Sequence, residues 1–266
     1  MCVLVTGVAG FIGSFVARNL LHLGMHVVGM DSLNAYYDPG LKRARVDRLA
    51  TDARLRFEHV DLADMSMLQD AFRAHAPRRV VQMAAQAGVH HSLSRPEDYV
   101  RNNLVATANL LECCRHGDVE HLIFASSSSV YGLSRALPLS TRVPADHPAQ
   151  FYAATKRSTE LMAHAYSNLM GMPSTGLRFF SAYGPITDIS ANHVEVASVG
   201  GLLRIERREV VADTGSIRLR VGDRFVMPSS CLEHAMASRV VFGLSGMRVV
   251  VPAVEKSSGW GKHAAP

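Results

Sequence analysis

The sequence predicts an α/β fold over residues 1–185, a doubly wound parallel sheet, followed by a divergent segment at 186–266. Up to residue 185, short apolar stretches alternate with amphipathic ones, which is typical of parallel strands joined by helical crossovers. A glycine-rich turn directly follows the first apolar stretch, and the carboxylate of Asp31 ends the second. Together these observations predict a nucleotide-binding sheet.

The alternation defines the strands and helices of this sheet. Ile12, Val16 and Leu20 recur every four residues, which places them on one face of the first helix, against the sheet. Helices are expected to begin near Phe11, Pro39, Met65, Pro96 and Gln150. Strands are expected at Cys2–Thr6, His26–Met30, Arg56–Val60, Arg79–Met83, His121–Ala125 and Thr175–Phe180.

Composition argues against several classes of function. With 48% hydrophobic and 19% charged residues the chain can bury a core, and disorder throughout is not expected. No stretch has membrane-spanning length and the N-terminus carries no signal peptide, so a cytoplasmic protein without a membrane partner is expected. The net charge of +5 comes from scattered basic residues, so no nucleic-acid partner is expected. The cysteines lack metal-site spacing, so reduced thiols and no metal are expected at Cys2, Cys113, Cys114 and Cys231.

The glycine-rich turn predicts a dinucleotide site. Glycines let the backbone turn tightly and approach a pyrophosphate, whose charge is met by the N–H groups at the start of the following helix. Asp31 can accept hydrogen bonds from an adenosine ribose and would repel a 2′-phosphate, so NAD is favoured over NADP. A tight turn with an incidental carboxylate is the alternative. The residues of the predicted turn are Gly7, Gly10, Phe11, Ile12 and Gly13.

Two further motifs predict where the chemistry occurs. Tyr152 and Lys156 are four residues apart, so a helix places the phenol and the ammonium on one face. The cation stabilises a phenolate, which can then remove a proton from an alcohol. "FASSSSVYG" ends the fifth predicted strand, where ligands bind in doubly wound sheets, and its serines can hydrogen-bond the reacting oxygen. A surface Tyr–Lys pair and an ordinary loop are the alternatives.

With these motifs in order, the chain resembles the extended short-chain dehydrogenase/reductases, which have a Rossmann fold, and among them the NAD-dependent sugar-nucleotide epimerases. The likeness is closest to UDP-glucuronate 4-epimerases, through "VTGVAGFIGS", "DSLNAYYDPGLKRAR", "ASSSSVYG", "DHPAQFYAATKRSTELMAHAYS" and "TGLRFFSAYGP". This resemblance implies cofactor contacts at Asp61, Leu62, Ala84, Ala85 and Gln86. It implies substrate contacts at Asn103, Ser128 and Ser181.

The resemblance also implies a mechanism for a UDP-sugar substrate. Tyr152 would take the proton of the 4-hydroxyl while NAD accepts hydride from C4, and the 4-keto sugar would rotate and be reduced on its other face. Lys156 would hold the nicotinamide ribose, and Ser127 would bond the 4-oxygen. Related 4,6-dehydratases carry an Asp-Glu pair where this chain has Ser128 and Ser129, so epimerisation is favoured. UDP-glucose 4-epimerase activity remains a further alternative, and the family implies a role in polysaccharide biosynthesis.

The resemblance ends at Pro185, and all seven tyrosines lie before Ile186. The segment that would bind the sugar carboxylate and enclose UDP is not recognisable at 186–266. One interpretation is a truncation or frameshift near Ile186, which would leave an impaired NAD-binding remnant. Short strands are expected within "REVVAD", "SIRLRVGDRFVM" and "GMRVVVPAV". The resemblance further implies a homodimer formed through the helices that begin near Pro96 and Gln150.

Overall fold

The computed structural model describes residues 2–134, 139–180 and 182–185, together with the backbone of later strands up to residue 250. Its core is a six-stranded sheet in the order β3-β2-β1-β4-β5-β6, with every neighbouring pair parallel. The strands are β1 (Cys2–Thr6), β2 (His26–Asp31), β3 (Leu55–His59), β4 (Arg79–Gln82), β5 (His121–Ser127) and β6 (Ser174–Phe179). The predicted doubly wound sheet is confirmed, because this strand order reverses direction between β1 and β4.

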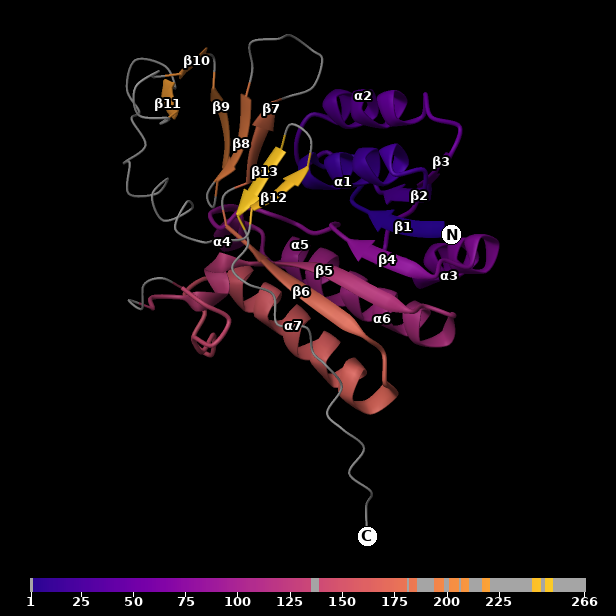
Figure 1. Ribbon diagram of the computed structural model, residues 1–266. Helices are drawn as coiled ribbons and strands as arrows, with labels where there is room; N and C mark the ends of the chain where they lie inside the picture. The colour runs from indigo at the N-terminus through magenta and orange to yellow at the C-terminus, as the bar shows by residue number, and fades with distance from the viewer. Residues whose placement is uncertain are drawn as a thin grey trace.

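Helices cover both faces of this sheet, as Figure 1 shows. On one face, Val3, Val5 and Val27 pack with Ala17 and Leu21 of α1. On the other, Leu4 and Val80 pack with residues of three further helices, which include Leu68, Phe72, Leu110, Leu111 and Ala163. The helices are α1 (Phe11–His22), α2 (Pro39–Leu49), α3 (Met65–His75), α4 (His91–Ser94), α5 (Pro96–Tyr99), α6 (Ala106–His116) and α7 (Phe151–Met170).

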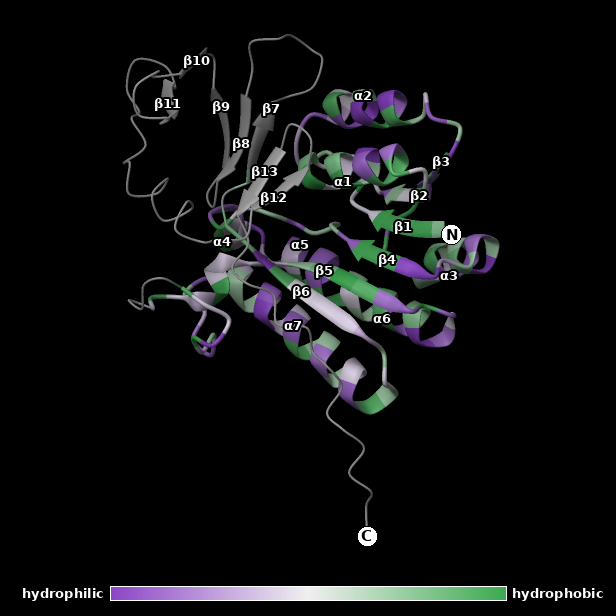
Figure 2. Ribbon diagram, viewed as in Figure 1, coloured by the Kyte–Doolittle hydropathy of each residue, from purple (hydrophilic) through white to green (hydrophobic). Residues whose placement is uncertain are grey.

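Hydropathy follows this layering. Figure 2 shows β1 and much of β5 as hydrophobic, whereas the helices alternate between hydrophobic and hydrophilic residues along their length. A strand that is covered on both faces needs apolar side chains in both directions, while a helix needs them only on the side that faces the sheet. The two periodicities therefore explain why strand and helix positions could be predicted from the sequence.

The helix that was expected to begin near Pro96 differs from the prediction. It is interrupted after α5 by a wider π-helical turn, η1 (Val100–Val105), before α6 continues. The turn carries Asn103, which is buried and hydrogen-bonds both the loop after β4 and helix α7. Such π-helical turns are rare and occur most often at functional sites. Hydrophobic periodicity contains no signal for this interruption.

After β6 the chain enters antiparallel strands. A five-stranded sheet has the order β12-β13-β7-β8-β9, and β10 pairs with β11. Two of these strands, β11 and β13, fall within segments for which strands were expected, and β10 overlaps the third segment. The strands are β7 (Ala182–Pro185), β8 (Val194–Ser198), β9 (Gly201–Ile205), β10 (Arg207–Val210), β11 (Ile217–Arg220), β12 (Val241–Leu244) and β13 (Met247–Val250).

Candidate active site

The backbone of the glycine-rich turn lies in direct contact with the backbone of the loop after β4. Gly7 has a φ of +69°, and its N–H donates to the Met30 carbonyl at 2.7 Å. A Cβ added to Gly7 would lie 2.6 Å from the Ala84 nitrogen, and one added to Gly13 would lie 2.0 Å from the Gly7 oxygen. Neither position can hold a side chain, so both glycines are required by this packing.

The N-terminus of α1 points its N–H groups at this turn. Gly10 is the N-cap, no described side chain accepts a hydrogen bond there, and the first helical bond runs from the Ser14 N–H to the Gly10 carbonyl. The N–H groups of Phe11, Ile12 and Gly13 therefore remain for a ligand. The positive end of the helix dipole favours an anion at this place.

The acidic residues predicted for the adenosine end lie at one edge of the sheet. Asp31 ends β2, and its carboxylate accepts hydrogen bonds from the Ala9 and Leu33 N–H groups at 3.1 and 2.9 Å. Asp61 follows β3 and forms an ion pair with Arg101 at 2.7 Å. Leu62 is buried next to it. These three predicted residues are thereby brought together.

A groove of about 110 Å³ connects the glycine-rich turn with these residues. The side chain of Gln86 is buried and hydrogen-bonds the hydroxyl groups of Tyr36 and Tyr99. The lining includes the predicted Gly7, Gly10, Asp31, Asp61, Leu62, Ala84, Ala85 and Gln86. The glycine turn that excludes side chains, the uncapped N-terminus of α1 and the carboxylate of Asp31 are the features expected of a dinucleotide site.

The predicted reacting residues meet at the carboxyl end of β5. Ser127 is buried at the last position of the strand, and its hydroxyl hydrogen-bonds Tyr152 of α7 and accepts from Ser129. Lys156 lies one turn further along α7 and donates to the Ala125 carbonyl at 2.7 Å. Ser128 follows at the start of a short 3₁₀ turn, η2 (Ser128–Tyr131), and is only partly buried. Serine, tyrosine and lysine thus form one cluster.

Burial shifts the titration of the two functional groups on α7 in opposite directions. Burial raises the pKa of the Tyr152 phenol, and the hydrogen bond with Ser127 lowers it by less. Burial also lowers the pKa of Lys156 to about 8. Both shifts favour the uncharged forms, because a charge is poorly solvated in this environment. Tyr152 is therefore a protonated phenol at neutral pH when it is considered with the protein groups alone.

Asn103, predicted to lie near the substrate, has all its hydrogen-bonding atoms engaged with protein groups. Its Oδ1 accepts from the Gln86 N–H at 2.7 Å, and its Nδ2 donates to the Gln86 carbonyl and to Thr155 Oγ1. The side chain therefore joins the loop after β4 to the helix that carries Tyr152 and Lys156. A direct substrate contact at Asn103 stays a prediction, and Ser181 lies outside the described residues.

A partly buried ion pair between α7 and β6 lies next to the cluster, and it was not anticipated from the sequence. Glu160 of α7 accepts from the Ser126 hydroxyl at 2.6 Å and from the Arg178 guanidinium of β6 at 2.8 and 2.9 Å. Burial alone would raise the pKa of Glu160, but these hydrogen bonds and one from Arg157 outweigh it and lower the pKa. The signal in the sequence that could have found Glu160 is its position four residues after Lys156, on the same face of the helix.

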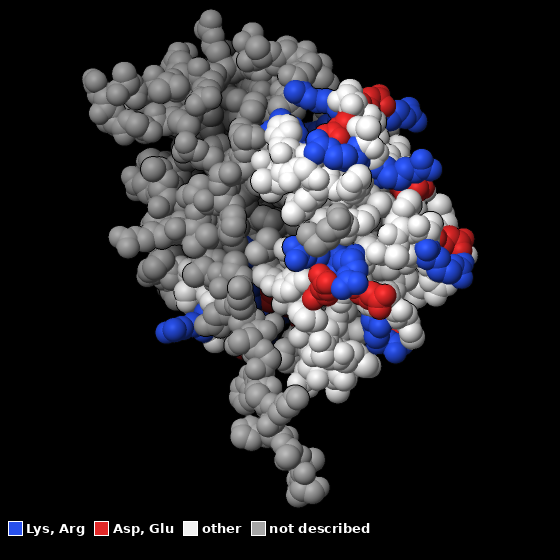
Figure 3. All heavy atoms as spheres, turned by 45° about the vertical axis from the view of Figure 1, so that its right-hand side comes forward, with Lys and Arg blue, Asp and Glu red and all other residues white. Residues whose placement is uncertain are grey.

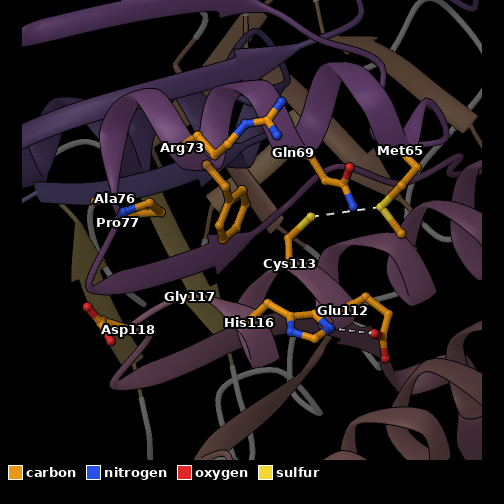
Figure 4. A pocket seen from close by; sticks show the side chains of 11 residues that line it. Met65, Gln69, Arg73, Ala76, Pro77, Glu112, Cys113, His116, Gly117 and Asp118 are labelled. Atoms are coloured by element: carbon orange, nitrogen blue, oxygen red, sulfur yellow. Dashed lines mark hydrogen bonds and ion pairs between the residues drawn. The ribbon is translucent and has the colours of Figure 1, made fainter.

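A second, larger cavity among the described residues is not the site of this chemistry. It measures about 480 Å³ and lies between α3 and α6, as Figure 4 shows. Pro77 and Asp118 on its rim precede β4 and β5, so it lies toward the amino ends of the strands. Ligands in such sheets bind at the carboxyl ends. Its one thiol, Cys113, is unreactive because burial raises its pKa to about 11.

The surface and the remaining motifs add little to the site. On the face in Figure 3, basic and acidic side chains are interspersed. Ion pairs of the described surface include Arg78–Glu120 and Arg115–Glu112. None of the helices in the described part of the chain is long and apolar enough to cross a membrane. Within that same part, no group of three or more His, Cys, Asp or Glu residues could hold a metal ion.

Comparison with known proteins identifies the family. A family model described as "NAD dependent epimerase/dehydratase family" matches residues 3–209. The chain belongs to this family. Protein CapI of Staphylococcus aureus is 48% identical over 185 residues, which cover 70% of this chain and 55% of CapI. UDP-glucuronate 4-epimerase 1 of Arabidopsis thaliana is 45% identical over 184 residues, which cover 69% of this chain and 43% of that protein.

Solved structures agree with this assignment. The crystal structure of the Bacillus cereus UDP-glucuronic acid 4-epimerase, in complex with UDP-glucuronic acid and NAD, matches with a TM-score of 0.63 and 33% identity, over 68% of this chain and 57% of that chain. The predicted resemblance and the prediction of NAD are confirmed at the level of the family. The chain spans about half the length of the curated relatives it matches. The family match continues past Pro185 to residue 209.

Replacing Gly13 with alanine should weaken NAD binding by about 10- to 100-fold, because the new Cβ forces the first turn of α1 away from Gly7. Titration calorimetry with NAD measures this loss. Gly171→Ala is the matched control: that glycine ends α7 with a φ of +65°, so alanine strains the backbone there, but nothing lies within 4 Å of the added Cβ and the glycine-rich turn is untouched. Equal NAD affinity in Gly13→Ala and in the parent protein would contradict the assigned pyrophosphate site.

Lys156 should make stability depend on pH in a defined window. Its pKa is lowered from 10.5 to about 8, so between these values the unfolded chain binds the extra proton and the folded one does not. The free energy of unfolding should therefore rise with pH across this window, by about 3 kcal/mol in full. Urea unfolding of the parent and of Lys156→Met at several pH values measures it. The rise should be absent in the variant, and identical pH profiles would refute the shift.

Proposed function

We propose that this chain is an NAD-dependent 4-epimerase of a UDP-sugar, and that its substrate is UDP-glucuronate. The observation that carries the proposal is the cluster of Ser127, Tyr152 and Lys156 at the carboxyl end of β5, beside a groove that fits NAD. The choice of sugar is supported by similarity to relatives that are named UDP-glucuronate 4-epimerases. Cell-surface polysaccharide synthesis is the process that would use the product.

The protein groups would manage the proton of the sugar 4-hydroxyl. Tyr152 accepts this proton at its phenolic oxygen, while Ser127 donates a hydrogen bond to the same sugar oxygen and holds it in place. A phenol with a raised pKa is a poor base, so a positive charge must lie close to it when it reacts. Lys156, one helical turn away, supplies a cation when it is protonated.

When bound, NAD would supply the reversible acceptor for the hydride on C4 of the sugar. The groove would hold its pyrophosphate at the N-terminus of α1 and its adenosine ribose at Asp31. Lys156 would orient the nicotinamide ribose. Because proton and hydride both return to the sugar, the reaction needs no net oxidant.

Dehydration is disfavoured by the serines that follow β5. Elimination of water requires one group to remove a proton from the neighbouring carbon and another to protonate the leaving hydroxyl. Ser128 and Ser129 stand where related dehydratases carry an acid pair, and a serine hydroxyl remains protonated at neutral pH. Epimerisation at C4 does not require this acid–base pair, and Ser127, Tyr152 and Lys156 are the groups proposed to carry it out.

A second candidate is an NAD-binding protein without turnover. Its support is the length of the chain, which spans about half of its curated relatives. Much of the energy for positioning a sugar nucleotide comes from contacts far from the reacting carbon. If residues 186–266 do not provide them, the cofactor site can be intact while turnover is lost. On this proposal the chain divides into a cofactor domain at 1–185 and a divergent segment at 186–266.

Incubation of the protein with UDP-glucuronate and NAD should yield UDP-galacturonate, detected by anion-exchange chromatography. Tyr152→Phe should lower the rate by about 100-fold or more, because the variant lacks the proton acceptor. Tyr166→Phe is the matched control, since Tyr166 lies in the C-terminal part of α7, where it hydrogen-bonds Glu112 of α6. Absence of product from protein that binds NAD would reject the epimerase and favour the second candidate.

A homodimer through α6 and α7 is proposed as the assembly. The two helices pack together, and α7 exposes Leu161 by 53% and Leu169 by 72%. Light scattering after gel filtration should give the mass of two chains. Leu161→Glu should shift it to one chain, whereas Leu23→Glu, at a leucine after α1 that is 74% exposed, should not. A single-chain mass for the parent protein would contradict this assembly.

A further inference from the structure

The two walls of the cofactor groove are joined by one side chain. Tyr36, in the loop between β2 and α2, lines the groove together with Gln86 from the loop after β4. Its hydroxyl packs so closely on Gly88 that a Cβ added there would lie 2.5 Å from the oxygen. Gly88 has a φ of +96°, which favours glycine at this contact. Tyr36 therefore spans from one wall to the other.

The far end of this bridge is a set of rings on the β4 side. The Tyr36 ring lies 5.0 Å from the ring of His91, and its hydroxyl hydrogen-bonds that of Tyr99. Tyr99 is fully buried and donates to the Ala87 carbonyl at 2.7 Å. Its ring also lies 6.1 Å from the ring of Tyr152. Tyr99, the residue to which the Tyr36 hydroxyl is bonded, is thus held in place within the core.

The near end is held by a buried cation. Lys42, only 5% exposed, donates from Nζ to the Asn34 carbonyl at 2.8 Å and to Asn34 Oδ1 at 2.6 Å. These bonds fix the loop two residues before Tyr36. Tyr36 itself is 40% exposed, so part of its side chain faces solvent while both of its neighbours in the bridge are held by buried groups. Tyr36 is thus a partly exposed side chain between two fixed groups, Asn34 with Lys42 on one side and Tyr99 on the other, and this arrangement suits a gate.

We propose that Tyr36 gates the cofactor groove, and that NAD enters and leaves only when the Tyr36 bridge to Gly88, His91 and Tyr99 opens. The bridge is made only of protein groups, so its contacts do not require a bound ligand. If opening is fast, the open fraction multiplies the association and dissociation rate constants by the same factor. A gate therefore changes both rates and leaves the dissociation constant almost unchanged, whereas an ordinary contact residue changes dissociation alone.

Stopped-flow fluorescence with NADH as the probe distinguishes these cases. In Tyr36→Ala both rate constants should rise by about 10-fold, while Kd should change by less than about 3-fold. Tyr36→Phe keeps the ring against His91 and loses the hydroxyl bond, so both rates should rise by a smaller factor. Tyr166→Phe should change neither rate, because that residue lies outside the groove.

Three outcomes would overturn the gate. Faster dissociation with unchanged association would make Tyr36 a contact residue only, unchanged rates would show that the bridge does not control entry, and slower association would show that Tyr36 shapes the site. The conservative Tyr36→Phe variant keeps the test valid if Tyr36→Ala folds poorly, which circular dichroism reports. No sugar nucleotide is used, so the result is independent of whether the chain epimerises UDP-glucuronate.

Discussion

The functional half of this molecule depends on one close approach, between the backbone of Gly7 and the backbone of Ala84. Strands β2, β1 and β4 are adjacent and parallel, so their carboxyl ends open at the same edge of the sheet. The approach joins the loops after β1 and β4, which line a narrow groove together with the loop between β2 and α2 and the N-terminus of α1. A side chain at Gly7 or Gly13 would separate these parts, and the anion site would be lost with them.

Helix α7 brings the reacting groups to this groove. It presents Tyr152, Lys156 and Glu160 at intervals of four residues, so one face meets β5 three times, at Ser127, at the Ala125 carbonyl and at Ser126. The buried ammonium of Lys156 is costly to the fold, whereas the Glu160–Arg178 pair ties the same helix to the sheet. Burial of Lys156 therefore lowers the stability of the fold, and the Glu160–Arg178 pair, one helical turn away, offsets part of this cost.

Much of this could be predicted from the sequence, because the evidence is local. Strand periodicity located β1 to β6, and the glycine spacing, Asp31 and the Tyr152–Lys156 pair identified the groove and the cluster. Features that depend on contacts between distant segments were missed. The π-helical turn at Val100–Val105 carries Asn103, which hydrogen-bonds Gln86 and Thr155, and the bridge at Tyr36 needs Gly88 and Tyr99. No periodicity or short motif encodes such pairings.

The decisive measurement follows a label at the reacting carbon. UDP-glucuronate carrying deuterium at C4 should give UDP-galacturonate that retains the deuterium at C4, measured by mass spectrometry and NMR. Retention is expected because the hydrogen leaves C4 as hydride and returns to C4 of the same sugar within one closed site. Product in which the label has exchanged with water would mean that C4 loses a proton instead. That result would contradict the roles assigned to NAD, Ser127 and Tyr152.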